Sequence, residues 1–375
     1  MIIKNNRLST LILGAVFLVI IAAVLVMRVL RERTVDQKRA VSMVIPGTNT
    51  AAATKTSLMA LDNARQLIRA LRASAMKTSD VQALCVANGA LLEQLRLLGA
   101  EAIPAYLSEI ADKTSPASLR ILLIEMIANL ASRHDPRVGQ ALMAIITDTA
   151  DNKGVRMQAL QWIPVTGDQT AGAKLLEMLP QQTDADLEFG ITRALGGFKV
   201  PDSVSVLKAE LADEKGYLIR IAASHAVAAQ GGQEALLVLQ NAAASKLAAR
   251  SDESHAEENA VAVHGILALG ELPDANTLPI LERILKNSNN SVSVRSKAAE
   301  TIGVIGGANA NQILRSRLLE EENESVLVYV ARGLMRCGDT SAGQQCMQRA
   351  ATVSDSYTKN ELERTARELQ GKARP

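Results

Sequence analysis

One pattern of apolar residues returns roughly every 30 to 40 residues along this chain, and this repetition constrains the fold more than any other feature. In one copy, Ala298 and Ile302 lie four residues apart, as on one face of a helix, and a second apolar period begins at Ile313. Gly306 and Gly307 separate the two periods, and glycine accepts the positive φ with which many helices end. Each copy is therefore predicted to be a helical hairpin, and the copies are predicted to form a stacked array.

An aspartate falls in the turn before the second helix of several copies. A short carboxylate can accept hydrogen bonds from the free amides at the start of a helix, and it complements the positive end of the helix dipole. We therefore predict that these residues are N-caps and not catalytic acids: Asp135, Asp168, Asp202, Asp274 and Asp339.

Short motifs recur with the hairpins: a Val-Arg pair near the first helix, a Gly-Asp turn, and an Ala-x-Pro-x-Leu run in the second helix. The matches are Val155-Arg156, Val294-Arg295, Gly167-Asp168, Gly338-Asp339 and residues 102–107. In these motifs the chain resembles a HEAT-repeat protein, an armadillo-like α-solenoid, of the bacterial type. The resemblance covers roughly residues 80–355 and about eight units. Glu188 and Leu327 replace the expected arginine in two of those units.

The composition agrees with a solenoid. Hydrophobic residues make up 48% of the chain but aromatic residues only 2%, so Ala, Leu, Ile and Val must fill the core. A single repeat cannot bury its apolar face alone, so the two ends of the array need caps. The predicted fold class is all-α: a solenoid of about eight HEAT-like hairpins in residues 57–375, with cap helices in residues 57–75 and 357–369.

The stretch Leu8–Met27 contains 20 residues and no charge, which is long enough to cross a hydrocarbon core about 30 Å thick. We therefore expect a tail in residues 1–7, a transmembrane anchor in residues 8–30, and a basic juxtamembrane segment with a Thr/Ala-rich linker in residues 31–56. A cleavable signal peptide is the alternative interpretation. The apolar run is longer than usual for such a peptide, and an Arg-rich sequence follows it.

The charges around this run bear on its orientation. More Lys and Arg residues follow the run than precede it, which favours a single-pass membrane protein with its repeats on the cytoplasmic side. Short positively charged tails also often stay inside while the rest of a chain crosses, so the opposite orientation stays open.

The charge balance argues against a nucleic-acid partner. Seven of the 41 Lys and Arg residues lie in residues 1–39, against two of the 39 Asp and Glu residues, so the rest of the chain has a slight acidic excess. A basic footprint across the repeats is therefore missing, and aromatic residues on which bases could stack are scarce.

The histidines and cysteines show no recognisable ligand spacing. Residues 251–259 gather carboxylates around His255, with His264 downstream, but the stretch is interpreted as a solvated loop or helix extension. HEAT-like hydroxylases that bind iron use His-Glu pairs, whereas no histidine here is followed by Glu. Cys337 and Cys346 flank one turn and could approach each other, although small buried residues are the simpler interpretation.

No nucleophile elbow, phosphate-binding loop or dinucleotide-binding turn occurs in the sequence. We therefore expect no catalytic, cofactor or metal site, and no enzyme activity. The predicted function is a membrane-tethered scaffold that binds a protein partner. The alternative is a HEAT-like enzyme of the bilin lyase type acting on a tetrapyrrole chromophore, which such repeats also resemble, but few aromatic residues are present to line its pocket.

The second helices line the inner face of proteins of this resemblance, so the partner site is predicted there. Aligning residues 280–281, 313–314 and 346–347 brings charged residues to equivalent positions, where they could form a cationic stripe for an acidic partner. A merely solvated face is the alternative. The predicted partner-binding residues are Arg283, Lys286, Arg315, Arg317 and Arg349.

Overall fold

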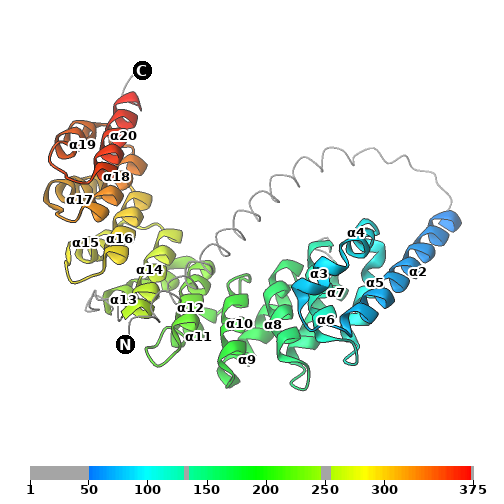
Figure 1. Cartoon of the computed structure of the whole chain (residues 1–375). Helices are drawn as coiled ribbons and strands as arrows, with labels where there is room; N and C mark the ends of the chain where they lie inside the picture. Colours follow the sequence, from blue (N-terminus) through cyan, green and yellow to red (C-terminus); the bar gives the residue numbers. More distant parts are fainter. Residues whose placement is uncertain (1–49, 131–134, 246–254, 373–375) are drawn as a thin grey trace, which may run out of the picture. The chain divides into compact units, whose positions relative to one another are not determined.

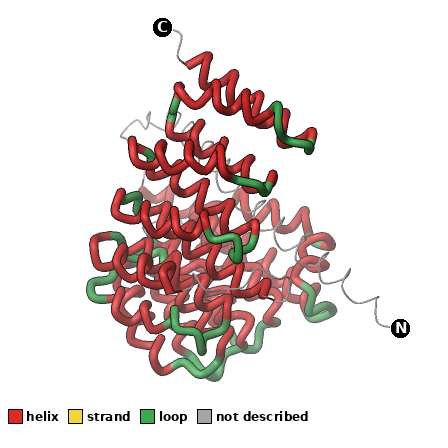
Figure 2. Tube along the Cα trace, turned by 90° about the vertical axis from the view of Figure 1, so that its left-hand side faces the viewer, coloured by secondary structure: helices red, strands yellow, loops and turns green. Residues whose placement is uncertain are grey.

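The computed structural model describes residues 50–130, 135–245 and 255–372, and all regular secondary structure in these ranges is helical (Figure 2). This confirms the all-α prediction for the described residues. The chain divides into two compact units, residues 1–59 and 60–375, and the second unit contains the repeats.

Eight helix pairs follow one another in the described residues, and each pair consists of a first helix and a second helix. The first helices are α3 (Val81–Ala87) with α4 (Gly89–Leu97), α6 (Ala117–Leu130), α8 (Lys153–Trp162), α10 (Ala185–Leu195), α12 (Tyr217–Gln230), α14 (Ala256–Glu271), α16 (Val292–Ile305) and α18 (Glu324–Cys337). The second helices are α5 (Ile103–Ala111), α7 (Pro136–Thr147), α9 (Gln169–Met178), α11 (Ser203–Ala209), α13 (Gly232–Ser245), α15 (Leu278–Lys286), α17 (Gly307–Glu320) and α19 (Gly343–Ala350).

Further helices flank these pairs or lie between their members. Helix α2 (Thr50–Ala75) precedes the first pair and α20 (Ser356–Lys372) follows the last. Short 3-10 helices lead into or out of several second helices: η1 (Gly99–Ala102), η2 (Ile163–Thr166), η3 (Leu179–Gln181), η6 (Ala275–Thr277) and η7 (Thr340–Ala342).

The pairs pack in two layers. From α6 to α20 each first helix contacts the next one, and Figure 1 shows α16, α18 and α20 side by side. The second helices contact one another in the same order from α11 to α19, and α5 also contacts α7. A continuous core of small aliphatic residues fills the space between the layers, with Ala298, Ile302 and Leu314 fully buried. The apolar period that predicted the hairpins is thus the face that each hairpin buries.

Most of the predicted N-caps are confirmed. Asp135 and Asp168 accept hydrogen bonds from the amides of Arg137 and Thr170, at the starts of α7 and α9. Asp274 and Asp339 cap η6 and η7 in the same way. The prediction is wrong for Asp202, whose side chain makes no capping bond. Its backbone adopts φ 58°, in the left-handed region that a short polar side chain tolerates.

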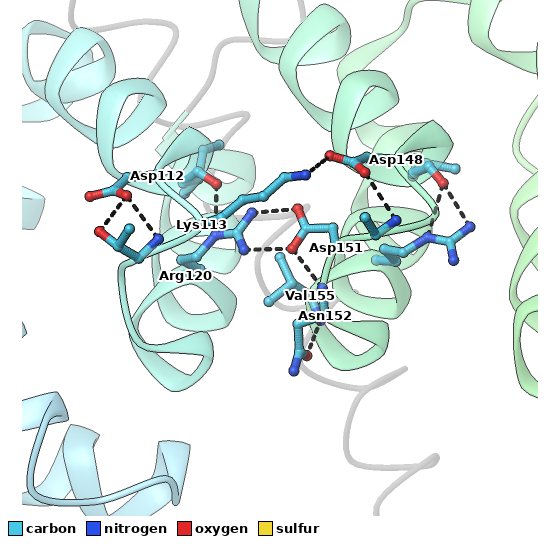
Figure 3. A network of polar contacts seen from close by, with 12 residues as sticks. Asp112, Lys113, Arg120, Asp148, Asp151, Asn152 and Val155 are labelled. Atoms are coloured by element: carbon cyan, nitrogen blue, oxygen red, sulfur yellow. Dashed lines mark hydrogen bonds and ion pairs between the residues drawn. The ribbon is translucent and has the colours of Figure 1, made fainter.

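Buried arginines at the fourth position of several first helices join neighbouring repeats. In α6, Arg120 donates from Nε to the carbonyl oxygen of Ile110 at 2.8 Å, and it forms two hydrogen bonds of 2.6 Å with Asp151 in the loop before α8 (Figure 3). Lys113 contacts Asp148 in the same view. Each such pair fixes one repeat to the next by charge, in addition to the apolar packing.

Helices α16 and α18 approach each other closely through glycines. A Cβ added to Gly303 would lie 2.6 Å from the Cα of Gly333, and one added to Gly333 would lie 2.8 Å from the carbonyl oxygen of Ala299. Any side chain at these positions would force the two helices apart. The distance between α16 and α18 therefore depends on the absence of a side chain at both Gly303 and Gly333.

No helix in the described ranges is long and apolar enough to cross a membrane. The prediction of a single-pass membrane protein with cytoplasmic repeats is therefore wrong for the part of the chain that the structure describes. The run on which it was based, Leu8–Met27, lies outside the described residues, as does everything else up to residue 49.

Candidate functional site

A groove of about 730 Å³ opens between α7 and the start of α9. One face of α7 forms its first wall, and η2 with the beginning of α9 forms the second. The lining residues are Pro136, Gln140, Met143, Ala144, Thr147, Thr166, Gly167, Asp168, Thr170 and Lys174.

Two glycines explain why the groove lies at this position. Gly139 of α7 lies so close to the η2–α9 turn that an added Cβ would be 3.1 Å from the Cβ of Asp168. Gly172 of α9 packs in the other direction, where an added Cβ would be 2.7 Å from Val200 and 2.8 Å from Phe198. Helix α9 thus packs against the loop before α11, and α7 and α9 pack less closely than α5 and α7 do.

The polar groups of the groove differ in their availability. Asp168 accepts hydrogen bonds from both the amide and the hydroxyl of Thr170, at 3.0 and 2.7 Å, and Thr147 donates to the carbonyl oxygen of Met143. Gln140 and Lys174 are exposed, and neither side chain forms a hydrogen bond or ion pair with a described residue. The groove therefore combines an apolar wall with an amide and an ammonium group that can bind a ligand.

The structure places the predicted cationic stripe on α15, α17 and α19, where most of its charges already have partners. Arg315 forms a bidentate ion pair with Asp339. Arg317 bonds to the carboxylate of Glu321 at 2.7 Å, and Lys286 pairs with Glu282 at 2.6 Å. The described structure gives Arg283 no ion-pair partner.

Arg349, the fifth residue of the stripe, also has hydrogen-bond partners within the chain. Its Nη2 donates to the carbonyl oxygen of Glu321 at 2.6 Å, and its Nη1 donates to the hydroxyl of Thr352 at 2.8 Å. The alignment behind the stripe is one residue out of register on α19, because Cys346 is fully buried and Met347 is 44% exposed. The five residues therefore do not form one row of free cations.

A histidine pair connects α12 and α14. Nε2 of His225 lies 3.0 Å from Nδ1 of His264, and Nδ1 of His225 lies 2.9 Å from a carboxylate oxygen of Glu271. Burial, together with the neighbouring His225 and Lys297, lowers the pKa of His264. The neutral pair can be satisfied with Nδ1 of His264 donating to His225, and Nδ1 of His225 donating to Glu271. This pair could not be predicted from the sequence, because 39 positions separate the two histidines.

The cluster around His255 lies only partly within the described residues. Glu258, at the start of α14, pairs with Arg220 at 2.7 Å. Asp252 and Glu253 lie outside the described residues. In the described ranges no group of three or more His, Cys, Asp and Glu side chains could hold a metal ion.

The three cysteines, Cys85, Cys337 and Cys346, are free thiols. Burial raises the pKa of Cys346 to about 12 and that of Cys337 to about 11, so both thiols stay protonated near neutral pH. Cys346 is buried, which agrees with its interpretation as a small buried side chain, whereas Cys337 is only half-buried.

Comparison with known proteins supports a HEAT-repeat protein. Residues 247–335 match the model of the HEAT repeats family. The crystal structure of the karyopherin Kap121p bound to the SUMO protease Ulp1p is similar at 14% identity with a TM-score of 0.53, covering 82% of this chain and 36% of that one. At this identity the likeness shows the fold alone.

Two curated relatives carry the name of an enzyme. Deoxyhypusine hydroxylase of Danio rerio is 30% identical over 82 residues, which are 22% of this chain and 27% of that protein. The enzyme of the same name from Arabidopsis thaliana is 33% identical over 88 residues, which are 24% of this chain and 28% of that protein. The chain thus matches little more than a quarter of the length of these relatives.

These matches correct two expectations. The expectation of a protein without catalytic activity is contradicted, because both curated relatives are named as hydroxylases. The bacterial type has no support either, because the two relatives come from a fish and a plant.

Proposed function

We propose that this HEAT-repeat chain binds a protein partner, and that the groove between α7 and α9 holds a segment of that partner. The observation that carries the proposal is the opening between two neighbouring second helices, with a volume of about 730 Å³. Repeat arrays of this type present extended concave surfaces that bind partners.

The lining of the groove suits a peptide. Met143, Ala144 and Pro136 offer an apolar wall for a side chain of the partner. Gln140 has both an amide donor and a carbonyl acceptor, so it can bond to a peptide backbone in either direction. Kap121p, whose fold is similar, has been solved bound to the protein Ulp1p and to Nup53p.

A random-peptide phage library tests this proposal directly. Ala144→Arg introduces a bulky charge on the wall of the groove, while Ala173→Arg places the same residue on an exposed part of α9 outside the groove. Peptides selected on the wild type should bind the Ala144→Arg variant at least about tenfold more weakly, which is about 1.4 kcal/mol, and the Ala173→Arg variant equally well. Equal loss in both variants, or no selection above the starting library, would refute a groove for peptides.

A second candidate function is that of a HEAT-like enzyme, which the hydroxylase relatives favour. The strongest proton-transfer arrangement described is the Glu271–His225–His264 chain, in which a carboxylate orients one imidazole against another. His264→Gln would remove the terminal imidazole. Mass spectrometry of a selected peptide, incubated with wild type or variant, would show a modification that depends on His264 if this candidate is right.

The tetrapyrrole alternative would use the α7–α9 groove, whose volume lies in the usual range for small-molecule sites. Its lining includes no aromatic side chain against which a tetrapyrrole could stack. Incubation of the purified chain with a bilin, followed by absorption spectroscopy, would test it. A shifted spectrum that Ala144→Arg abolishes would support a chromophore site, and an unchanged spectrum would refute it.

A further inference from the structure

Three of the four buried arginines at the fourth position of a first helix have a carboxylate partner. Each partner comes from the loop before the next first helix or from the beginning of that helix, so each pair connects two repeats. The pairs are Arg120 with Asp151, Arg220 with Glu258, and Arg295 with Glu321.

Arg156 of α8 is the exception. Its Nε and Nη2 both donate to the carbonyl oxygen of Ile146, at 3.1 and 3.0 Å, as Nε of Arg120 does to Ile110. The side chain is only 8% exposed, yet no described carboxylate lies within ion-pair distance of its guanidinium. Arg156 is therefore a buried cation whose bonds go only to a neutral acceptor.

The residue that should supply the carboxylate is an amide. Gln182 lies two residues before the N-cap Asp184 and accepts its backbone hydrogen bond at 3.1 Å. Glu321 lies two residues before the N-cap Asn323 and accepts the same bond at 2.9 Å. Glu321 also pairs with an arginine through its carboxylate, whereas Gln182 has the same shape without the charge.

The neighbouring acids do not replace the missing partner. Nζ of Lys153 forms ion pairs with carboxylate oxygens of both Asp184 and Asp186, at 2.8 and 2.5 Å. Glu188, at the fourth position of α10, is paired with Lys215. A buried charge without a paired counter-ion destabilises the fold. An oxyanion that reaches Arg156 would remove that cost and would gain charge-assisted hydrogen bonds.

We propose that Arg156 is an anion-binding subsite, in which a carboxylate or phosphate group of a ligand supplies the negative charge that Glu321 supplies to Arg295. The planar guanidinium can bind either oxyanion. The subsite is independent of the α7–α9 groove, because Arg156 is not among the residues that line it. Its success or failure therefore leaves the proposed peptide groove untouched.

Gln182→Glu tests the subsite, because it restores the missing carboxylate with almost no change in shape. Gln181→Glu is the matched control, since it adds the same charge to the adjacent exposed residue. The full chain and both variants are compared by thermal unfolding in chloride, phosphate and acetate at equal ionic strength and neutral pH. Phosphate and acetate separate the two sources of the oxyanion. Calorimetric titration with inorganic phosphate and with acetate gives the affinities.

We expect the wild type to unfold at a higher temperature in phosphate or acetate than in chloride. Gln182→Glu should unfold at a higher temperature than the wild type in chloride, and should bind the effective anion at least about tenfold more weakly, because its own carboxylate occupies the guanidinium. Gln181→Glu should behave as the wild type. The proposal is overturned if the wild type shows no anion response. It is also overturned if all three proteins respond equally, which would indicate an adventitious ion only.

Discussion

Arg120→Met removes the cation of the best-defined buried ion pair and leaves its carboxylate in place. The side chains of Arg120 and Asp151 are 2% and 3% exposed, so the remaining carboxylate would be buried without a counter-ion. Removal of one partner of such a pair typically costs about 3 to 5 kcal/mol. Methionine retains most of the apolar volume, so the expected loss in free energy of unfolding is chiefly electrostatic.

The pH dependence of the stability deficit tests the same prediction independently. The hydrogen bond from Arg120 lowers the pKa of Asp151, against the opposing effect of burial. A carboxyl whose pKa is lower in the folded state stabilises the fold above its unfolded pKa, and this stabilisation is lost as the pH falls through the folded pKa. In Arg120→Met, the effect of burial, which raises the pKa of Asp151, would be opposed only by the amide of Asn152 and the charge of Lys113, so protonation would relieve part of the penalty. The deficit relative to wild type should be largest at neutral pH and smaller near pH 4.

Urea unfolding followed by circular dichroism at both pH values measures the deficit, and hydrogen exchange of α6 and α8 shows whether it is local. Arg65→Met is the matched control, because Arg65 and Asp62 form an exposed pair that should contribute less than about 1 kcal/mol. Asp151→Asn combined with Arg120→Met should recover part of the loss. Equal costs for the buried and exposed arginines, or a deficit that does not change with pH, would refute the reasoning.

Gly303→Ala should lower the unfolding temperature markedly, because its Cβ would meet the backbone of Gly333, whereas Gly265→Ala, with open space around it, should be neutral or slightly stabilising. Equal effects of the two substitutions would contradict the close contact. Ile302→Asp should cost several kcal/mol, since an unpaired carboxylate would replace a fully buried side chain; an unchanged urea midpoint would show that Ile302 does not face the core. Cys346 should react with iodoacetamide at pH 8 far more slowly in the folded than in the urea-unfolded protein, because burial raises its pKa to about 12; similar rates would exclude that burial.

The sequence determined the class of fold because its information is local and repeated. The spacing of Ala298 and Ile302, the glycine pair after them and the aspartates in the turns specify helices, turns and caps within a few residues of each other. The repetition of this pattern leaves little choice but stacking, because one hairpin cannot bury its own face. The burial of Ile302 and four of the five predicted N-caps follow from such local rules.

Only the tertiary structure determined the features that depend on distances between repeats, namely the ion pairs and the groove. Glu188 looked like a departure from the repeat, but in the structure it pairs with Lys215, so the charges of that inter-repeat contact are simply reversed. The cationic stripe stays a prediction, and only the structure shows that Asp339 and Glu321 form ion pairs with two of its members, Arg315 and Arg317. The groove depends on how closely α9 packs against α7. The missing counter-ion of Arg156 depends on one amide, that of Gln182, which lies 26 residues further along the chain. Periodicity encodes which face a helix buries, whereas the partner of a buried charge is set by three-dimensional packing between repeats.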